Sequence, residues 1–300
     1  MRVKNLIKKL YKPREQNLIK SEDEKYRKFV NELEKIIFED EKWLEEKYFS
    51  LASLWSLYFY ALEVSSVLYK GFYKLISRKQ QSDEKEIVAH YKKVIEESMP
   101  YITQLLKLNN LSIPEIEVYK DKKMSKKHVA AYNIEEKRIE IFNPIKSIIS
   151  PLHEYGHHLR NIFGSLGTYN PDNYYQRIVE EGFAEVFAYV IIEKLLYDKR
   201  DDIFSLLYGA ELYSYFFVNF SKYLDLIGKS HIRKKVENKI PNFKKIKKPI
   251  SILYKFAKEP YVVGSVIMLY LVDKIGKDVL EDILRDRYYE VLNKLRKRNL

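Results

Sequence analysis

The chain has 300 residues, of which 46% are hydrophobic, and it contains only nine glycines and nine prolines. This composition is typical of a globular protein with a substantial core and argues against long disordered tracts. There is no cysteine, which excludes disulfide bonds and cysteine-ligated metal sites, so any metal ion has to be held by histidine and carboxylate side chains.

The net charge is +12, and the lysines are spread along the chain. Such a charge can indicate nucleic acid or a membrane surface as partner, but no nucleic-acid-binding motif accompanies it. A composition rich in Lys and Glu, with 26 tyrosines, resembles that of thermophilic proteins. We therefore interpret the charge as a solvated surface and expect neither partner. Residues 1–13 lack the apolar core and cleavage site of a signal peptide, which favours a cytoplasmic location.

Residues 1–110 are predicted to form a helical N-terminal region, and residues 111–300 a second domain that this region covers. The expected helices are an amphipathic one over 22–47, an apolar one over 48–76, one capped by Asp83 and Glu86, and a short one beginning at Pro100.

The apolar stretch Tyr48–Tyr69 is long enough to span a bilayer, with Glu63 as its only charge. Five serines dilute it. We therefore favour a helix buried in protein, and a membrane-associated protein is the alternative.

Short strands are expected after Pro114. The first covers Glu115–Lys120, and Val129–Ile134 and Arg138–Phe142 form a hairpin. Ser150 as N-cap and Pro151 as first helical residue then predict a helix that ends at Gly164, followed by a loop over 165–173.

This helix carries the sequence His153-Glu154-Tyr155-Gly156-His157. Residues i and i+4 share a helix face, and here that face lies away from the apolar stripe of Leu152 and Leu159. A single helical histidine is usually a packed core residue, but two on a polar face can bind one zinc ion. The glutamate then lies beside the metal and can act as a general base.

A second helix, Tyr174–Tyr197, carries Glu181 and Glu185 four residues apart, and small Ala184 lets it approach the first helix closely. Glu181 is predicted as the third metal ligand and Glu185 as a carboxylate that supports the ligands. Glu180 is an alternative ligand, although its face of the helix lacks a comparable partner.

Downstream, an apolar helix is expected over Ile203–Ile227 and a basic, turn-rich connection over Lys229–Pro249. A buried helix over Tyr261–Ile275 is ended by Gly276, and a charged C-terminal helix follows.

Together these motifs resemble the gluzincin zinc metallopeptidases, in particular the catalytic domain of the aminopeptidase-N-like family. Glu181-Gly182-Phe183-Ala184 resembles the ligand helix of that family, and Pro260-Tyr261-Val262-Val263-Gly264 resembles its tyrosine segment. The resemblance covers roughly residues 116–284. It implies a mostly α (α+β), zincin-like domain in which a small twisted sheet lies beside the HExxH helix. An edge strand, either Arg138–Phe142 or Val129–Ile134, would align the substrate backbone.

The resemblance also implies a role for each residue. His153, His157 and Glu181 would bind one Zn²⁺ per chain, and Glu154 would be the general base in hydrolysis of a peptide or protein substrate. Tyr261 would stabilise the oxyanion. His231 is an alternative oxyanion donor, although a solvated loop histidine is the simpler interpretation.

Two departures from the family bear on specificity. The N-terminal half lacks the family's large β-domain, and Ala130-Ala131-Tyr132-Asn133 stands where a Gly-x-Met-Glu-Asn motif would bind a free amino terminus. These departures favour an endopeptidase or a peptidase of unknown specificity. A non-catalytic zincin-fold protein that binds its partner through the basic surface is the alternative, and the sequence does not indicate the oligomeric state.

Overall fold

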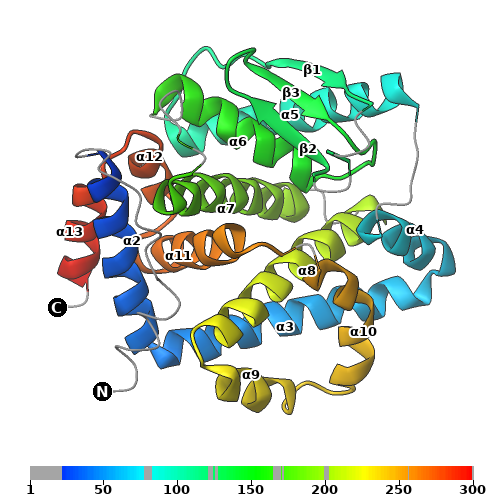
Figure 1. Ribbon diagram of the computed structural model, residues 1–300. Helices are drawn as coiled ribbons and strands as arrows, with labels where there is room; N and C mark the ends of the chain where they lie inside the picture. The colour runs from blue at the N-terminus through cyan, green and yellow to red at the C-terminus, as the bar shows by residue number, and fades with distance from the viewer. Residues whose placement is uncertain are drawn as a thin grey trace.

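The structure, a computed structural model, describes residues 22–77, 83–120, 124–125, 128–164, 170, 172–198, 203–255 and 257–298. This part of the chain is mostly helical with one small sheet (Figure 1), which confirms the expected mostly-α class. The helices are α2 (Glu22–Glu39), α3 (Glu41–Val64), α4 (Ser66–Ile76), α5 (Glu84–Leu106), α6 (Ile149–Phe163), α7 (Tyr174–Asp198), α8 (Ile203–Leu226), α9 (Ser230–Glu237), α10 (Phe243–Tyr254), α11 (Glu259–Ile275), α12 (Val279–Leu284) and α13 (Tyr288–Arg298).

The sheet contains β1 (Glu115–Val118), β2 (Ala130–Asn133) and β3 (Arg138–Ile141) in the order β1-β3-β2. The predicted hairpin is confirmed, since β2 pairs antiparallel with β3, and β1 pairs with β3 in parallel. Buried Ile139 and Ile141 alternate with more exposed residues along β3, as expected for a sheet with one face on the core. Because β2 is an edge strand, one of its sides has no neighbouring strand among the described residues.

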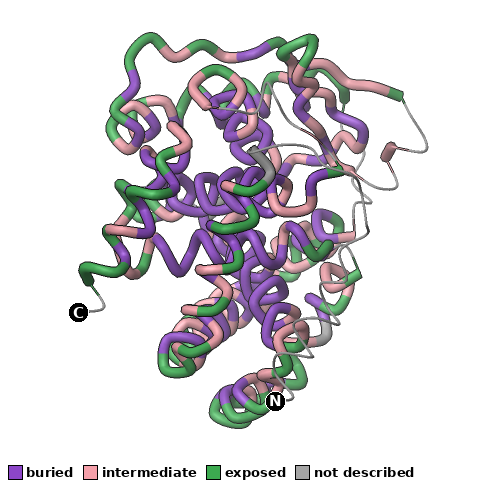
Figure 2. The backbone as a smooth tube through the Cα atoms, turned by 60° about the vertical axis from the view of Figure 1, so that its left-hand side comes forward, coloured by how far each residue is buried: buried purple, intermediate pink, exposed green. Residues whose placement is uncertain are grey.

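Helices α6, α7 and α11 lie in successive layers below the sheet (Figure 1). The middle one, α7, is buried on almost every side, and Figure 2 shows that buried residues are concentrated in the middle of the molecule. It packs against α6 on one side and α11 on the other. The predicted helix over 174–197 is confirmed, and the structure shows that it is the central element of the fold.

Close contact between α7 and α11 depends on two glycines. A Cβ atom added to Gly182 would lie 2.5 Å from the carbonyl carbon of Gly264, and one added to Gly264 would meet the backbone of Gly182 at 2.8 Å. Only glycine allows this approach of two backbones. Gly182 follows Glu181 directly and Gly264 lies three residues after Tyr261, so this contact brings Glu181 and Tyr261 to the same region, where both line one cavity.

Several predicted helix limits were wrong. Pro100 lies inside α5, which is continuous, and both Pro100 and Glu96 are exposed. Water can therefore bind the Glu96 carbonyl that proline leaves without a donor. Ser150 is not the N-cap of α6, because the helix begins at Ile149 and the Ser147 hydroxyl accepts the Ser150 amide at 3.1 Å.

The basic stretch over 229–249 is largely helical rather than turn-rich, because apolar side chains at helical spacing lie beneath its lysines. Ile232 and Val236 of α9 and Ile246 and Ile250 of α10 are buried. The expected C-terminal helix is divided into α12 and α13. Most of the predicted loop over 165–173, and all of residues 1–13, lie outside the described residues.

The apolar stretch over 48–76 is also divided. It breaks at Ser65, whose hydroxyl accepts the Leu68 amide at 3.3 Å and caps α4. Among the described helices, none has the length and apolar character needed to cross a membrane. One apolar core extends from Tyr26 in α2 to Leu295 in α13, so the helices before residue 110 share it with those that follow.

Candidate metal centre

The α6 helix presents His153 and His157 to α7 from successive turns. Their Nε2 atoms lie 3.1 Å apart, and their ring centroids are separated by 4.8 Å at an interplanar angle of 81°. The i, i+4 spacing brings the rings together because both side chains leave the same face of the helix. The sequence therefore correctly predicted that the two imidazoles meet.

Glu181 of α7 completes a triangle with these imidazoles. Its Oε2 atom lies 3.3 Å from His153 Nε2 and 3.4 Å from His157 Nε2. Three ligands on a tetrahedral zinc ion with bonds of 2.0–2.1 Å are about 3.3–3.4 Å from one another. The spacing of the three donor atoms therefore fits a zinc ion.

The state of Glu181 is consistent with a cation site. Its Oε2 is buried and accepts no hydrogen bond from the described residues. Burial opposes its ionisation, but His153 and His157 outweigh burial and hold the pKa of this carboxyl well below its usual value. Ligand atoms of His153, Glu154 and His157 also lie within 4.8 Å of one another. The shorter distances make Glu181 the better placed third ligand.

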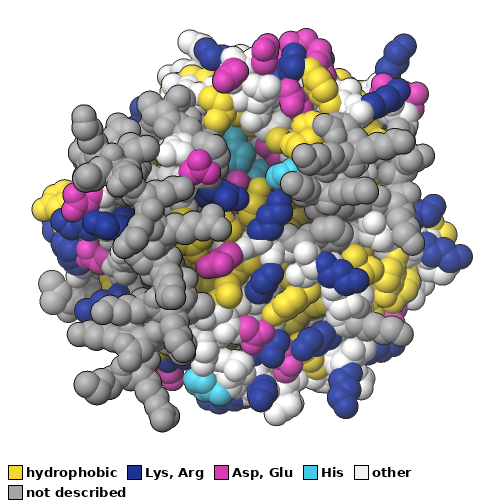
Figure 3. Space-filling model, in the orientation of Figure 1, with side chains coloured by type: hydrophobic (Ala, Val, Ile, Leu, Met, Phe, Trp, Pro, Cys, Tyr) yellow, Lys and Arg dark blue, Asp and Glu magenta, His cyan; other side chains and the backbone are white. Residues whose placement is uncertain are grey.

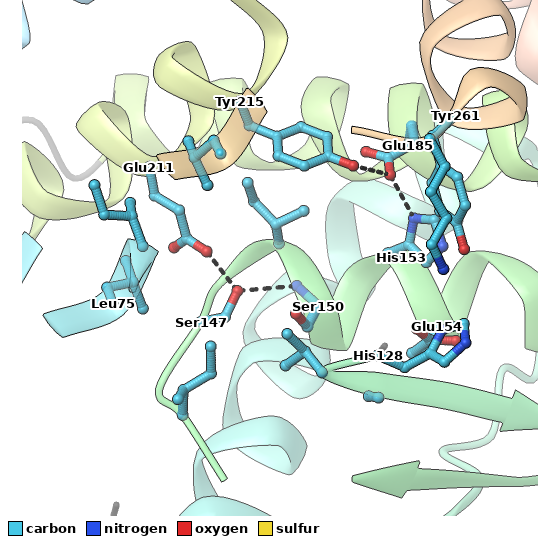
Figure 4. A pocket seen from close by; sticks show the side chains of 17 residues that line it. Leu75, His128, Ser147, Ser150, His153, Glu154, Glu185, Glu211, Tyr215 and Tyr261 are labelled. Carbon is cyan, nitrogen blue, oxygen red and sulfur yellow. Dashed lines mark hydrogen bonds and ion pairs between the residues drawn. The ribbon is translucent and has the colours of Figure 1, made fainter. Parts of the chain in front are cut away.

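A second carboxylate lies beside the other ring nitrogen of His153. Glu185 Oε1 lies 3.3 Å from His153 Nδ1 and accepts a hydrogen bond of 2.8 Å from the Tyr215 hydroxyl on α8 (Figure 4). Burial, together with the neighbouring Glu185 charge, raises the pKa of Tyr215 well above 10, so this hydroxyl stays a donor. Sequence reasoning missed Tyr215, because nothing in its local sequence distinguishes it among 26 tyrosines.

Glu154 and Tyr261 lie on the open side of the imidazoles. Glu154 is buried, and burial raises its pKa; the backbone of Tyr132 on edge strand β2 contacts its carboxylate. Tyr261, in the first turn of α11, stacks on His153 with centroids 5.9 Å apart and planes at 16°. Burial and the nearby Glu181 and Glu154 raise the pKa of Tyr261 well above 10, so its hydroxyl is a hydrogen-bond donor.

Two cavities, of about 150 and 130 Å³, meet at this group of residues. On the surface, histidine side chains are set back in a hollow of the molecule (Figure 3). The residues that line both cavities are His128, Ala130, His153, Glu154 and Tyr261. His128 is an addition to the predicted site, since its sequence position before β2 did not reveal a partner.

The other candidate residues lie elsewhere. Glu180 forms a buried ion pair with Arg160, with Nε–Oε2 and Nη2–Oε1 distances of 2.8 and 2.5 Å, so it is directed away from the imidazoles. His158 Nδ1 lies 3.1 Å from the Tyr132 hydroxyl, and burial lowers the pKa of His158 to about 4. His231 is exposed on α9, which Figure 1 places at the opposite end of the molecule from α6.

Comparisons with protein families, curated proteins and solved structures found no match to this chain. Two imidazoles and a carboxylate are arranged as ligands, a second carboxylate and a tyrosine flank them, and all of these open onto a cavity.

Proposed function

We propose that the protein is a zinc-dependent peptidase with a zincin-like catalytic domain. The observation that carries the proposal is the triangle of His153 Nε2, His157 Nε2 and Glu181 Oε2, with sides of 3.1, 3.3 and 3.4 Å. A bound zinc ion would act as a Lewis acid and lower the pKa of a water molecule from about 16 to about 7.

The chain's own residues account for the proton transfers. Glu154 would take a proton from the attacking water and return it to the departing amine. Tyr261 keeps its proton and would donate a hydrogen bond to the developing oxyanion. Glu185, itself held by Tyr215, favours the tautomer of His153 in which Nδ1 carries the proton and Nε2 is free to bind metal.

Edge strand β2 supports a polypeptide as the substrate. It carries Ala130, which lines both cavities, and its Tyr132 backbone contacts Glu154. An extended peptide added along an unpaired strand edge obtains regular backbone hydrogen bonds. A substrate bound in this way would pass directly beside Glu154 and Tyr261.

The test measures zinc stoichiometry by mass spectrometry, together with hydrolysis of a peptide library. Wild type is expected to bind one zinc ion per chain and to cleave. Glu154→Gln should retain zinc and lose hydrolysis, whereas Glu181→Ala should lose both. Glu193→Gln, twelve residues further along the same helix and paired at the surface with Lys277, is the control and should retain both.

Wild type that binds no zinc would refute the proposed centre. Wild type that binds zinc but cleaves no peptide would point instead to a binding protein on the same scaffold. Loss of zinc in the Glu193→Gln control would show that the effect of Glu181→Ala is not specific to the ligand position.

A further inference from the structure

The larger cavity extends from the candidate metal centre to the beginning of α6. Beyond the shared residues, apolar side chains from several separate parts of the chain form much of its wall. They include Leu75 and Ile76 of α4, Ile145, Ile149 of α6 and Leu253 of α10. Figure 4 shows Leu75 and Glu211 at the opposite end of the cavity from His153.

A single buried carboxylate interrupts this apolar end. Glu211 of α8 is only 9% exposed. Its Oε1 accepts a hydrogen bond of 2.5 Å from the Ser147 hydroxyl, and its Oε2 accepts one of 3.2 Å from the Ile148 amide. Each carboxylate oxygen can accept two hydrogen bonds. The contacts within the described chain therefore leave capacity for a further donor.

No cation of the described residues forms an ion pair with Glu211. Lys258 lines the same cavity, but its ammonium lies over the Tyr261 ring, 5.9 Å from the centroid. Burial raises the pKa of Glu211 to about 7, although Ser147 and Ile148 oppose that rise. A cation that entered the cavity would restore the charged form and pair with it in surroundings of low dielectric constant.

Glu211 also caps α6 through Ile148, and capping alone would be a purely structural role. If capping were the only role of Glu211, its carboxylate would not need to line a cavity that reaches the candidate metal centre. In addition, the Ser147 hydroxyl already accepts the Ser150 amide at this end of the helix. Ile148 precedes His153 by five residues, which corresponds to about 7 Å along the α6 axis. A ligand that reaches from the centre to Glu211 therefore needs a long stem.

We infer that the larger cavity binds a lysine or arginine side chain of the substrate next to the scissile bond, with Glu211 receiving its cationic end. The inference rests on the proposed peptidase function. Lysine and arginine side chains have an apolar stem and a charged tip. The cavity offers matching surfaces in the same order, with apolar walls first and the Glu211 carboxylate at the far end. Glu211 is thus a specificity-determining residue rather than a catalytic one.

The test uses N-acetylated peptides, so that only a side chain can supply the cation. Each peptide carries lysine, arginine, norleucine or glutamate at one varied position, which lies directly before or directly after the cleaved bond. We expect the zinc-loaded wild type to cleave lysine or arginine peptides with kcat/KM roughly 10- to 100-fold above norleucine, which has a similar stem without the charge. Glutamate peptides should be poorer still.

In Glu211→Gln, the ratio of kcat/KM for the lysine peptide to kcat/KM for the norleucine peptide should fall towards one. Glu193→Gln should keep the wild-type ratio. If Glu211→Gln does not fold, the kcat/KM values of the lysine and norleucine peptides with wild type still test the inference. Equal cleavage of lysine and norleucine peptides by wild type would overturn the inference and leave the peptidase function standing.

A second measurement separates the two proposals. Zinc-loaded Glu154→Gln protein is titrated calorimetrically with the lysine and norleucine peptides. The cavity assignment is supported if the lysine peptide binds more tightly and if the double variant Glu154→Gln, Glu211→Gln loses this preference. This holds even if wild type cleaves nothing. Equal binding of both peptides contradicts it.

Discussion

At the scale of single residues, Tyr215 and Glu185 show how a candidate metal ligand, His153, can be supported by groups that lie outside the proposed ligand triangle. The Tyr215 hydroxyl, 2.8 Å from Glu185, is the hydrogen-bond donor that fixes this buried carboxylate beside His153 Nδ1. Such partners typically affect metal affinity by about 10- to 100-fold. We expect Tyr215→Phe to weaken zinc binding by roughly that factor, measured by competition with a chelator. Tyr289→Phe, at an exposed position, is the control, and equal affinities of the two variants would contradict the assignment.

Tyr261 should act on the rate rather than on metal binding. Its ring stacks on His153, and its hydroxyl opens onto the cavities that Glu154 also lines. Removal of one oxyanion donor costs about 10²–10³ in kcat. We therefore expect Tyr261→Phe to lower kcat by that factor with little change in KM, and to retain one zinc ion per chain. A large rise in KM with unchanged kcat would instead assign Tyr261 to substrate binding.

At the scale of elements, the contact between Gly182 and Gly264 holds α7 and α11 together beside the centre. A methyl group at Gly182 would lie 2.5 Å from Gly264 backbone atoms, so the helices would have to move apart. Overpacking of this kind costs about 1–3 kcal/mol. We expect Gly182→Ala to lower the free energy of unfolding by at least that amount, measured by urea denaturation, and to reduce activity by separating Tyr261 from Glu181.

The matched control is Gly71→Ala in α4, where an added Cβ atom meets nothing within 4 Å. Alanine is favoured over glycine inside a helix by roughly 0.5–1 kcal/mol, so this variant should be slightly more stable than wild type. If both variants were stabilised, the close contact of the glycines would not limit the packing of α7 on α11.

A buried ion pair joins α6 and α7 to the C-terminal helices. The Arg160 guanidinium contacts Glu180, Asp286 and the Tyr288 hydroxyl, and it donates to the Leu284 carbonyl at 3.0 Å. Because Arg160 and Glu180 are almost fully buried, loss of the cation would leave a carboxylate without its counter-charge, at a cost of about 3–5 kcal/mol.

Arg160→Met should therefore be strongly destabilised in chemical denaturation. Arg296→Met, which breaks the more exposed pair with Glu32, should change stability little. Equal unfolding midpoints for the two variants would show that the buried network does not stabilise the fold.

The sequence predicted contacts within one element better than contacts between elements. The helical period placed His153 and His157 on one face, and alternation of apolar residues located the hairpin of β2 and β3. The positions of Tyr215 and Glu211 at the site, and the pairing of Glu180 with Arg160, depend on how α6, α7 and α8 pack against one another. The local sequence pattern does not encode this packing. The continuous helix through Pro100 was missed for a related reason, since exposure decides whether an interior proline is tolerated.

At the scale of the whole molecule, the helices before residue 110 are built into the same core as the candidate centre. Trp43 and Trp55 of α3 are buried, and their indole nitrogens donate hydrogen bonds of 2.9 Å to Asp273 and to the Ile246 carbonyl. Helix α3 packs along α8, which carries Glu211 and Tyr215, while Leu75 and Ile76 of α4 line the larger cavity. The N-terminal helices thus support the site as well as cover part of it.

We therefore expect a chain that lacks residues 1–110 to fail to fold, because the apolar faces of α7, α8 and α11 would lose their cover. Circular dichroism and thermal unfolding, compared with the full chain, would show loss of cooperative melting, and zinc binding would be lost with the fold. A truncated chain that is helical, melts cooperatively and hydrolyses peptides faster than the full chain would show the opposite. In that case the N-terminal helices would be a removable cover over a domain that folds by itself.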